Sequence, residues 1–203
     1  MTSKFVLLSL VVLAVLSSGC TGPREDGAGP SREAVEMVVT AEWAPDGVIS
    51  EGEYARKISL SGGIFEVFWK NDAETLYMAI RGETGGWVSI GFDPSVWMKD
   101  ADIVIGYVDD EGEVYARDAY STGNYGPHPP DTDLGGTDDL LEYGGSEKDG
   151  FTVMEFKRKM DTGDEFDRSF RSGETVNIIW GMSDSDDPER RHQRAGKGKV
   201  TFM

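Results

Sequence analysis

The chain has 203 residues, with 37 acidic and 20 basic side chains and a formal net charge of −17. This length suits one folded domain with additional segments, and it is enough to bury a sizeable core. Such an acidic protein repels a phosphate backbone, and no long basic stripe offsets the repulsion, so no nucleic-acid partner is expected. The acidity favours solubility and says nothing about a reaction.

Residues 1–19 have the pattern of an export signal peptide. Lys4 precedes an apolar run over residues 5–16, which is too short for a stop-transfer helix, and small residues follow it. The sequence Leu16-Ser17-Ser18-Gly19-Cys20 resembles the lipobox of prokaryotic lipoproteins, in which the cysteine becomes the lipidated first residue. The alternatives are a plain secretory signal or an uncleaved anchor. Because Cys20 is the only cysteine, we expect lipidation there and a cell-membrane location facing the extracytoplasmic side.

The remaining chain divides into a tether and one domain. Residues 20–36 are predicted to be the lipidated cysteine and a flexible linker, because they are rich in Gly, Pro and Ser and lack apolar periodicity. Residues 37–203 are predicted to form a single domain.

The apolar pattern of this domain has period two, which is typical of β-strands. Clusters of Gly, Asp, Asn and Pro separate most of the apolar segments and indicate turns. The sequence predicts an all-β fold, an antiparallel β-sandwich of about ten to eleven strands. The predicted strands are residues 36–42, 57–61, 64–70, 75–81, 87–92, 102–108, 113–120, 140–143, 151–158, 175–182 and 198–203.

Two of these strands are apolar on both sides. Residues 103–108 contain no charged residue, and residues 176–182 are apolar except at Asn177. We therefore expect both strands to be central, with both faces covered. The face away from the core would need a cover, either a loop or a flat hydrophobic ligand.

Met98 and His192 are the most informative single residues. Met98 follows Trp97 in a loop and precedes two aspartates, whereas a structural methionine usually lies within an apolar run. On pattern alone it is still more often a gap-filler than a ligand. His192 lies in a polar loop before the last strand and would by itself be an exposed histidine. The other histidine, His128, lies between prolines and is predicted to be an exposed loop residue.

A basic island surrounds His192 in this acidic chain. Its members are Arg190, Arg191, Arg194, Lys197 and Lys199. Such cations would suit a ligand that carries carboxylates. The alternative is that they only offset the aspartates at positions 184, 186 and 187.

Other kinds of site have weaker support. The acidic segments 131–136 and 184–187 could hold calcium, but neither has the spacing of a twelve-residue calcium loop, so we expect solvated surface. The sequence has no nucleophile elbow, no His-Glu-x-x-His, no phosphate loop and no paired Cys and His with zinc spacing. No enzymatic activity is therefore expected.

Several blocks, in order, resemble the DOMON domain. They are Gly86-Trp87-Val88-Ser89-Ile90-Gly91-Phe92, Met98-Lys99-Asp100-Ala101-Asp102-Ile103-Val104-Ile105-Gly106-Tyr107, Asp118-Ala119-Tyr120, Phe156-Lys157-Arg158, Ile178-Ile179-Trp180-Gly181 and His192-Gln193-Arg194-Ala195-Gly196. The resemblance runs from about residue 40 to the end of the chain. It implies an immunoglobulin-like β-sandwich and either a cytochrome-like domain that binds haem b or a domain that binds sugars or other small ligands.

In cytochrome-like members of this family the axial ligands are a Met and a His, at positions that correspond to Met98 and His192. The resemblance thus implies non-covalent haem b, electron transfer and a redox protein partner. Arg191 and Arg194 would meet the haem propionates, and Trp97 would lie against the porphyrin. The alternative is a haem-free module for a carbohydrate or an aromatic ligand, or an accessory subunit of a redox complex. Trp97 and Asp102 are expected to hold the Met98 loop in shape.

Overall fold

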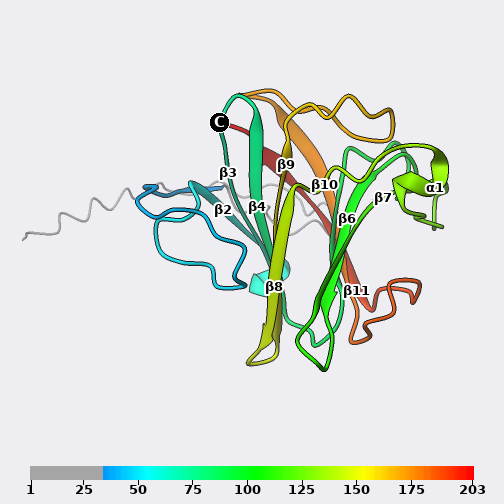
Figure 1. Ribbon diagram of the computed structural model, residues 1–203, viewed down its shortest axis with the longest axis horizontal. Helices are drawn as coiled ribbons and strands as arrows, with labels where there is room; N and C mark the ends of the chain where they lie inside the picture. Colours follow the sequence, from blue (N-terminus) through cyan, green and yellow to red (C-terminus); the bar gives the residue numbers. More distant parts are fainter. Residues whose placement is uncertain (1–33) are drawn as a thin grey trace, which may run out of the picture. The chain divides into compact units, whose positions relative to one another are not determined.

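The computed structural model describes residues 34–203. The predicted signal peptide, Cys20 and nearly all of the predicted linker lie outside the described residues. The described part is almost entirely β-structure, with one short α-helix and one 3-10 turn (Figure 1). Within residues 34–203 no helix is long and apolar enough to cross a membrane.

The strands form two antiparallel sheets that pack face to face. In chain order the elements are β1 (Val35–Glu36), β2 (Arg56–Leu60), η1 (Ser61–Gly63), β3 (Phe65–Asn71), β4 (Thr75–Gly82), β5 (Val88–Phe92), β6 (Asp102–Val108), β7 (Val114–Tyr120), α1 (Asp131–Leu134), β8 (Glu142–Lys148), β9 (Phe151–Lys159), β10 (Thr175–Met182) and β11 (Arg194–Thr201). The six-stranded sheet has the order β1-β2-β3-β4-β9-β8, and the five-stranded sheet has the order β11-β10-β5-β6-β7. The predicted all-β antiparallel sandwich is confirmed.

The core lies between the sheets and follows from the period-two pattern. Alternate residues of each strand point inward, so that Val67 and Trp69 of β3 face Ile178 and Trp180 of β10 within one buried cluster. The rings of Phe65 and Trp180 stack across the sheets with centroids 4.7 Å apart. Full burial of each such large side chain stabilises the fold by about 1.5–3 kcal/mol.

Three strands differ from the sequence prediction by more than one residue at an end. The first predicted strand is reduced to β1, because the chain then crosses the outer face of the six-stranded sheet and packs Met37, Trp43 and Ile49 against Tyr54 and Phe68. The strand predicted from residue 140 is shifted to residues 142–148, and β11 starts four residues earlier than predicted, since its first residue pairs with the last residue of β10.

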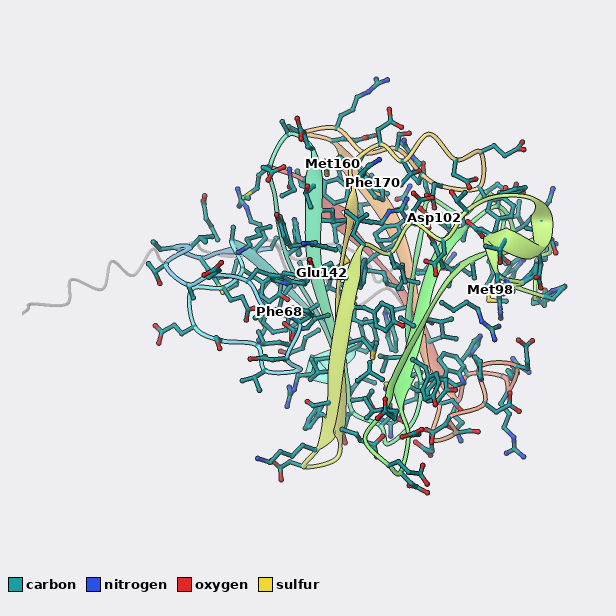
Figure 2. The ribbon with its side chains drawn as sticks, viewed as in Figure 1. Phe68, Met98, Asp102, Glu142, Met160 and Phe170 are labelled. Atoms are coloured by element: carbon teal, nitrogen blue, oxygen red, sulfur yellow. The ribbon has the colours of Figure 1, made fainter. Side chains whose placement is uncertain are left out.

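One end of the core is ionic. Arg158 of β9 donates from Nη1 to both carboxylate oxygens of Asp102 on β6, at 3.0 and 2.9 Å, and its Nη2 lies 3.0 Å from Asp167 Oδ1. These three side chains are at most 2% exposed. Because β9 and β6 belong to different sheets, the pair joins the two layers (Figure 2 labels Asp102).

The expectation about the central strands is confirmed. β6 and β10 flank β5 in the middle of the five-stranded sheet. Their outward residues Ile103, Ile105 and Ile179 form a second apolar cluster with Trp87 on the face away from the core. This face is where the candidate site lies.

Replacing Arg158 with Met should lower the free energy of unfolding by about 3–5 kcal/mol, because Asp102 and Asp167 would remain buried without their cation. Urea denaturation measures this change. Lys157→Met is the matched control: Lys157 lies one position earlier on β9 and pairs with the half-exposed Glu142, so its loss should cost less than about 1 kcal/mol. Equal effects of the two substitutions would contradict the structural role of Arg158.

Candidate functional site

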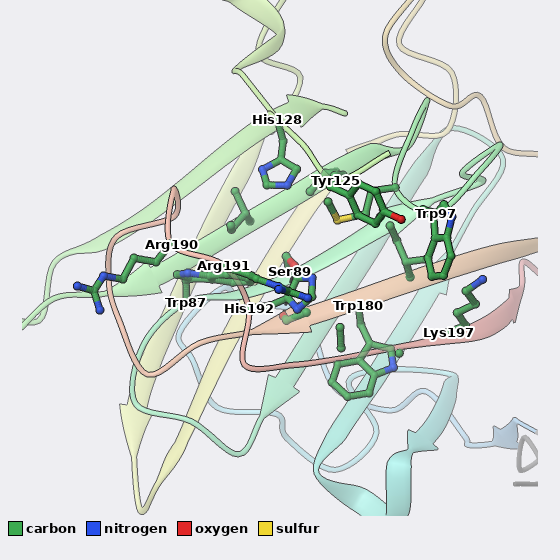
Figure 3. A pocket seen from close by; sticks show the side chains of 18 of the residues that line it. Trp87, Ser89, Trp97, Tyr125, His128, Trp180, Arg190, Arg191, His192 and Lys197 are labelled. Atoms are coloured by element: carbon green, nitrogen blue, oxygen red, sulfur yellow. Dashed lines mark hydrogen bonds between the residues drawn. The ribbon is translucent and has the colours of Figure 1, made fainter. Parts of the chain in front are cut away.

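A cavity of about 610 Å³ lies over the outer face of the five-stranded sheet (Figure 3). Its floor is built from β5, β6 and β10, and its walls come from three connections: residues 93–101, residues 121–130 and residues 183–193. The lining residues are Trp87, Ser89, Gly91, Trp97, Met98, Ile103, Ile105, Asn124, Tyr125, His128, Ile179, Trp180, Gly181, Glu189, Arg190, Arg191, His192, Ala195, Gly196 and Lys197. The volume is in the range of small-molecule and cofactor sites.

Two glycines leave space above the floor of this cavity, because they have no side chains. A Cβ atom on Gly91 would lie 2.9 Å from Ile179 Cγ1 and 3.1 Å from Ile103 Cγ1. A Cβ atom on Gly181 would lie 3.4 Å from the Cβ of His192. Side chains at these positions would crowd the floor and the histidine, so glycine leaves the space in which a ligand could lie.

The loop that presents Met98 is tied to the segment after β7. The Met98 amide donates to the Asn124 carbonyl at 3.3 Å, and the Asp100 amide donates to the Ser121 carbonyl at 2.8 Å. Trp97 has a φ of 59°, in the left-handed region that is uncommon for a residue with a large side chain. A turn between Val96 and Lys99 holds this conformation. The loop therefore presents Met98, which is half-buried, to the cavity.

His192 is placed by the end of the β10–β11 connection. Gln193 donates its amide to the Met182 carbonyl at 3.0 Å, which fixes the chain one residue after the histidine. On the other side, the Gln193 side-chain oxygen accepts a hydrogen bond from the Asp184 amide at 2.7 Å. His192 is half-buried and lies over Gly181. The fold thus brings Met98 and His192, which are distant in sequence, to one cavity.

The rim of the cavity is aromatic and basic. The rings of Trp97 and Tyr125 lie 5.9 Å apart and are 58% and 78% exposed. Lys197 lies over the Trp97 ring with Nζ 5.8 Å from its centroid (Figure 3). Within residues 34–203 neither Arg190 nor Arg191 forms an ion pair. These cations leave the rim suited to a ligand with carboxylates.

Of the predicted site residues, Met98, His192, Trp97 and Arg191 line the cavity, and Arg194 does not. Arg194 is exposed at the start of β11, and the residues of this strand that line the cavity, Ala195, Gly196 and Lys197, follow it. A role for Arg194 stays a prediction from the sequence.

His128 is not the exposed loop residue that the sequence indicates. It is half-buried and lines the same cavity, pointing inward from the segment after β7 (Figure 3). The flanking prolines do not predict that His128 lines a cavity. It lies there because residues 121–130 fold back over β7. Trp87, Ile103, Ile105 and Ile179 also line the site. For the three isoleucines, the signal in the sequence was the pair of strands that are apolar on both faces; Trp87 lies outside these two strands.

Burial keeps both histidines neutral near pH 7. Desolvation lowers the pKa of His192, and the nearby charge of Arg191 lowers it further. Desolvation also lowers the pKa of His128. A neutral imidazole offers a nitrogen lone pair, and the thioether of Met98 offers a soft sulfur, so the cavity carries two kinds of donor that iron accepts.

Two further expectations are wrong. Asp102 does not hold the Met98 loop, because its carboxylate is bound to Arg158 and to the Arg168 amide inside the sandwich. Asp131, expected at the solvated surface, is 1% exposed. The first error has a clear physical cause: Asp102 begins β6 and points inward, where Arg158 of another strand is its buried partner.

The geometry defines an antiparallel β-sandwich with a ligand-sized cavity on the outer face of one sheet. A DOMON domain model matches residues 61–183, and the chain belongs to this family.

Curated relatives match part of the chain. MOXD1 homolog 2 of Drosophila melanogaster is 30% identical over 132 residues, which is 65% of this chain and 17% of the relative. DBH-like monooxygenase protein 1 of Mus musculus is 33% identical over 129 residues, which is 62% of this chain and 19% of the relative. The chain thus spans less than a fifth of the length of these relatives. Among solved structures, the cytochrome domain of Myriococcum thermophilum cellobiose dehydrogenase aligns with a TM-score of 0.49 at 15% identity, over 68% of this chain and 75% of that one.

Proton titration of the two histidines by NMR should give pKa values below about 6.5 for both. A group whose pKa is lowered by folding takes up protons first in the unfolded state, so these histidines should reduce stability as the pH falls below about 6.5. In Arg191→Gln the pKa of His192 should rise, because the cation that lowers it is removed. A wild-type pKa at or above 6.5 for His192 would contradict its burial in the site.

Proposed function

We propose that this domain binds haem b non-covalently in the cavity, with Met98 and His192 as the axial ligands, and transfers electrons. The observation that carries the proposal is that a thioether and a neutral imidazole, from two different loops, line one apolar cavity. The family resemblance of the Met98 and His192 segments supports the same pair.

The other residues of the cavity fit this group. Ile103, Ile105 and Ile179 supply apolar surface, and Gly91 and Gly181 leave the floor free of side chains. Arg191 is available at the rim for a propionate. Trp97 lines the cavity at the solvent side, where its ring could cover the porphyrin edge.

The donor pair suggests what the chain itself contributes. Haem supplies a one-electron couple of iron, and a neutral thioether ligand raises its potential. Occupation of both axial positions by Met98 and His192 would leave no open position for oxygen, which argues for electron transfer and against an enzymatic role. The apolar floor would keep water from the ligand and so also favour the less charged, reduced state.

Titration of the full chain with haem should give a six-coordinate, low-spin absorption spectrum at a stoichiometry of one. Met98→Leu and His192→Ala should each lose the low-spin signature, because each removes one axial donor while the fold is retained. His128→Ala is the control, since it changes a histidine that lines the same cavity, and it should keep the signature. Chain that is produced with ample haem, remains colourless and takes up no haem would contradict the proposal.

A second candidate is a haem-free module for a carbohydrate or aromatic carboxylate. The exposed Trp97 and Tyr125 rings beside Lys197 favour it, since sugars and aromatic rings stack on such surfaces. Calorimetry with glycan and phenolic acid panels distinguishes the two functions. Saturable binding that Trp97→Ala abolishes and Met98→Leu leaves intact would support this candidate, and absence of binding by every probe would reject it.

We further propose that the domain is anchored to the cell membrane through lipidated Cys20, faces the extracytoplasmic side and exchanges electrons with a redox protein. The lipobox-like segment supports the anchor. In a bacterial host Cys20→Ala should move the chain from the membrane fraction to the soluble extracytoplasmic fraction, since it removes the lipid attachment. A wild-type chain found only in the soluble fraction would contradict the anchor.

A further inference from the structure

The ionic end of the core holds more negative charge than its partners neutralise. Asp102, Asp118 and Asp167 each place a carboxylate oxygen within 4.8 Å of the others. Asp131 joins this group, since the charges of Asp167 and Asp102 act on it. Arg158 is the cation that contacts this group. The nearby guanidinium of Arg168 instead pairs with Asp93 and Glu174.

The four carboxylates come from separate elements of the fold. Asp102 lies on β6 and Asp118 on the adjacent strand β7, both pointing toward the interior. Asp131 begins α1, directly after Pro130, which pairs with Ala119 of β7. Asp167 lies in the connection between β9 and β10. The arrangement is therefore a product of the tertiary fold and does not come from one loop.

Several of these oxygens have no hydrogen-bond donor. Asp118 is 3% exposed, and its Oδ2 accepts from the Asp139 amide at 2.9 Å, while its Oδ1 has no partner within residues 34–203. Both oxygens of Asp131, which is 1% exposed, also lack a donor within the described part of the chain. Buried carboxylate oxygens without donors are costly, which points to a ligand that the protein itself does not supply.

The pKa values of these carboxyl groups also indicate that the group suits a further cation. Desolvation and the neighbouring carboxylates together raise the pKa of Asp118 to about 8, that of Asp131 to about 7 and that of Asp167 to about 6, against the lowering effect of the Arg158 charge. Without another cation the group would have to take up protons near neutral pH.

We propose that Asp118, Asp131 and Asp167 bind one calcium ion at this end of the core, beside the Arg158–Asp102 pair. The donors are all oxygens, which hard cations prefer, and no cysteine or histidine takes part among the described residues. Ca²⁺ has 6–8 oxygens at about 2.3–2.6 Å, so the oxygens of Asp102, Asp118 and Asp167, which lie within 4.8 Å of one another, fit around a single ion. Asp131 adds a buried carboxylate without donors near this group. Mg²⁺ gives up its water reluctantly, which disfavours it in a buried site.

Such an ion would fix the segment that builds part of the cavity wall. Asp131 follows residues 121–130, which carry Tyr125 and His128 and hold the Met98 loop through Asn124 and Ser121. Calcium at Asp131 and Asp118 would join the end of this segment to β7. The calcium site lies on the inner side of the sheet and does not depend on haem. The two proposals can therefore be tested independently.

The test is calorimetric titration of chelator-treated full chain with CaCl₂, together with thermal unfolding in Ca²⁺, Mg²⁺ and chelator. We expect one saturable calcium site and a rise in Tm of about 5 °C or more at a concentration about a hundredfold above Kd. Asp118→Asn and Asp131→Asn should each abolish the calcium-dependent rise. Asp133→Asn, which changes an exposed aspartate of α1, should keep it.

The following results would overturn the calcium proposal. If the carboxylates take up protons and not calcium, wild-type chain will show no saturable calcium binding, and its Tm will be the same in Ca²⁺ and chelator. Its stability will then fall as the pH rises from 6 to 8, because groups with a raised pKa lose their protons over that range. That outcome overturns the proposal even if neither Asn variant folds, since it is measured on wild-type protein. A rise in Tm that Mg²⁺ matches would overturn the assignment to calcium.

Discussion

The ion pair between Arg158 and Asp102 is the constraint on which the arrangement of the two sheets depends. It joins β9 of one sheet to β6 of the other with both side chains essentially inaccessible to water. Apolar packing alone is not directional and would tolerate small shifts of one sheet over the other. The hydrogen bonds from Arg158 Nη1 to both oxygens of Asp102 tolerate them less, because hydrogen bonds weaken when their direction and distance change. The pair therefore restricts how the two sheets lie over one another, together with core contacts such as the stacking of Phe65 on Trp180.

The register of β6 in turn determines the outer face of the five-stranded sheet. Side chains alternate along a strand, so Asp102 and Val104 point inward while Ile103 and Ile105 point outward. The outward isoleucines would be exposed on a simple two-layer sandwich. Here three connections fold over them, and the glycines in the floor keep the space beneath these connections open. The cavity and the ionic end of the core thus lie on opposite sides of the same strand.

The residues that line the cavity differ in whether the sequence could identify them. The motif resemblance pointed to Met98 and His192, and the fold brings both to the cavity, although nothing in the spacing of two such distant residues fixes that result. His128 could not be found from the sequence, because prolines on both sides are typical of an exposed loop. Its position depends on backbone hydrogen bonds between residues 121–130 and β7, such as that from the Tyr120 amide to the Pro129 carbonyl. A contact of this kind leaves no periodic pattern in the chain.

The sequence by itself determined the class of fold and most strand positions, because alternation of apolar and polar residues is a local property of a half-buried strand. It also identified β6 and β10 as strands with two covered faces. Only the tertiary structure decided which charged residues are buried. Asp102 and Arg158 look like surface residues one by one, and they can leave water only because the fold brings them together, where each charge is stabilised by its partner and not by its neighbours in sequence.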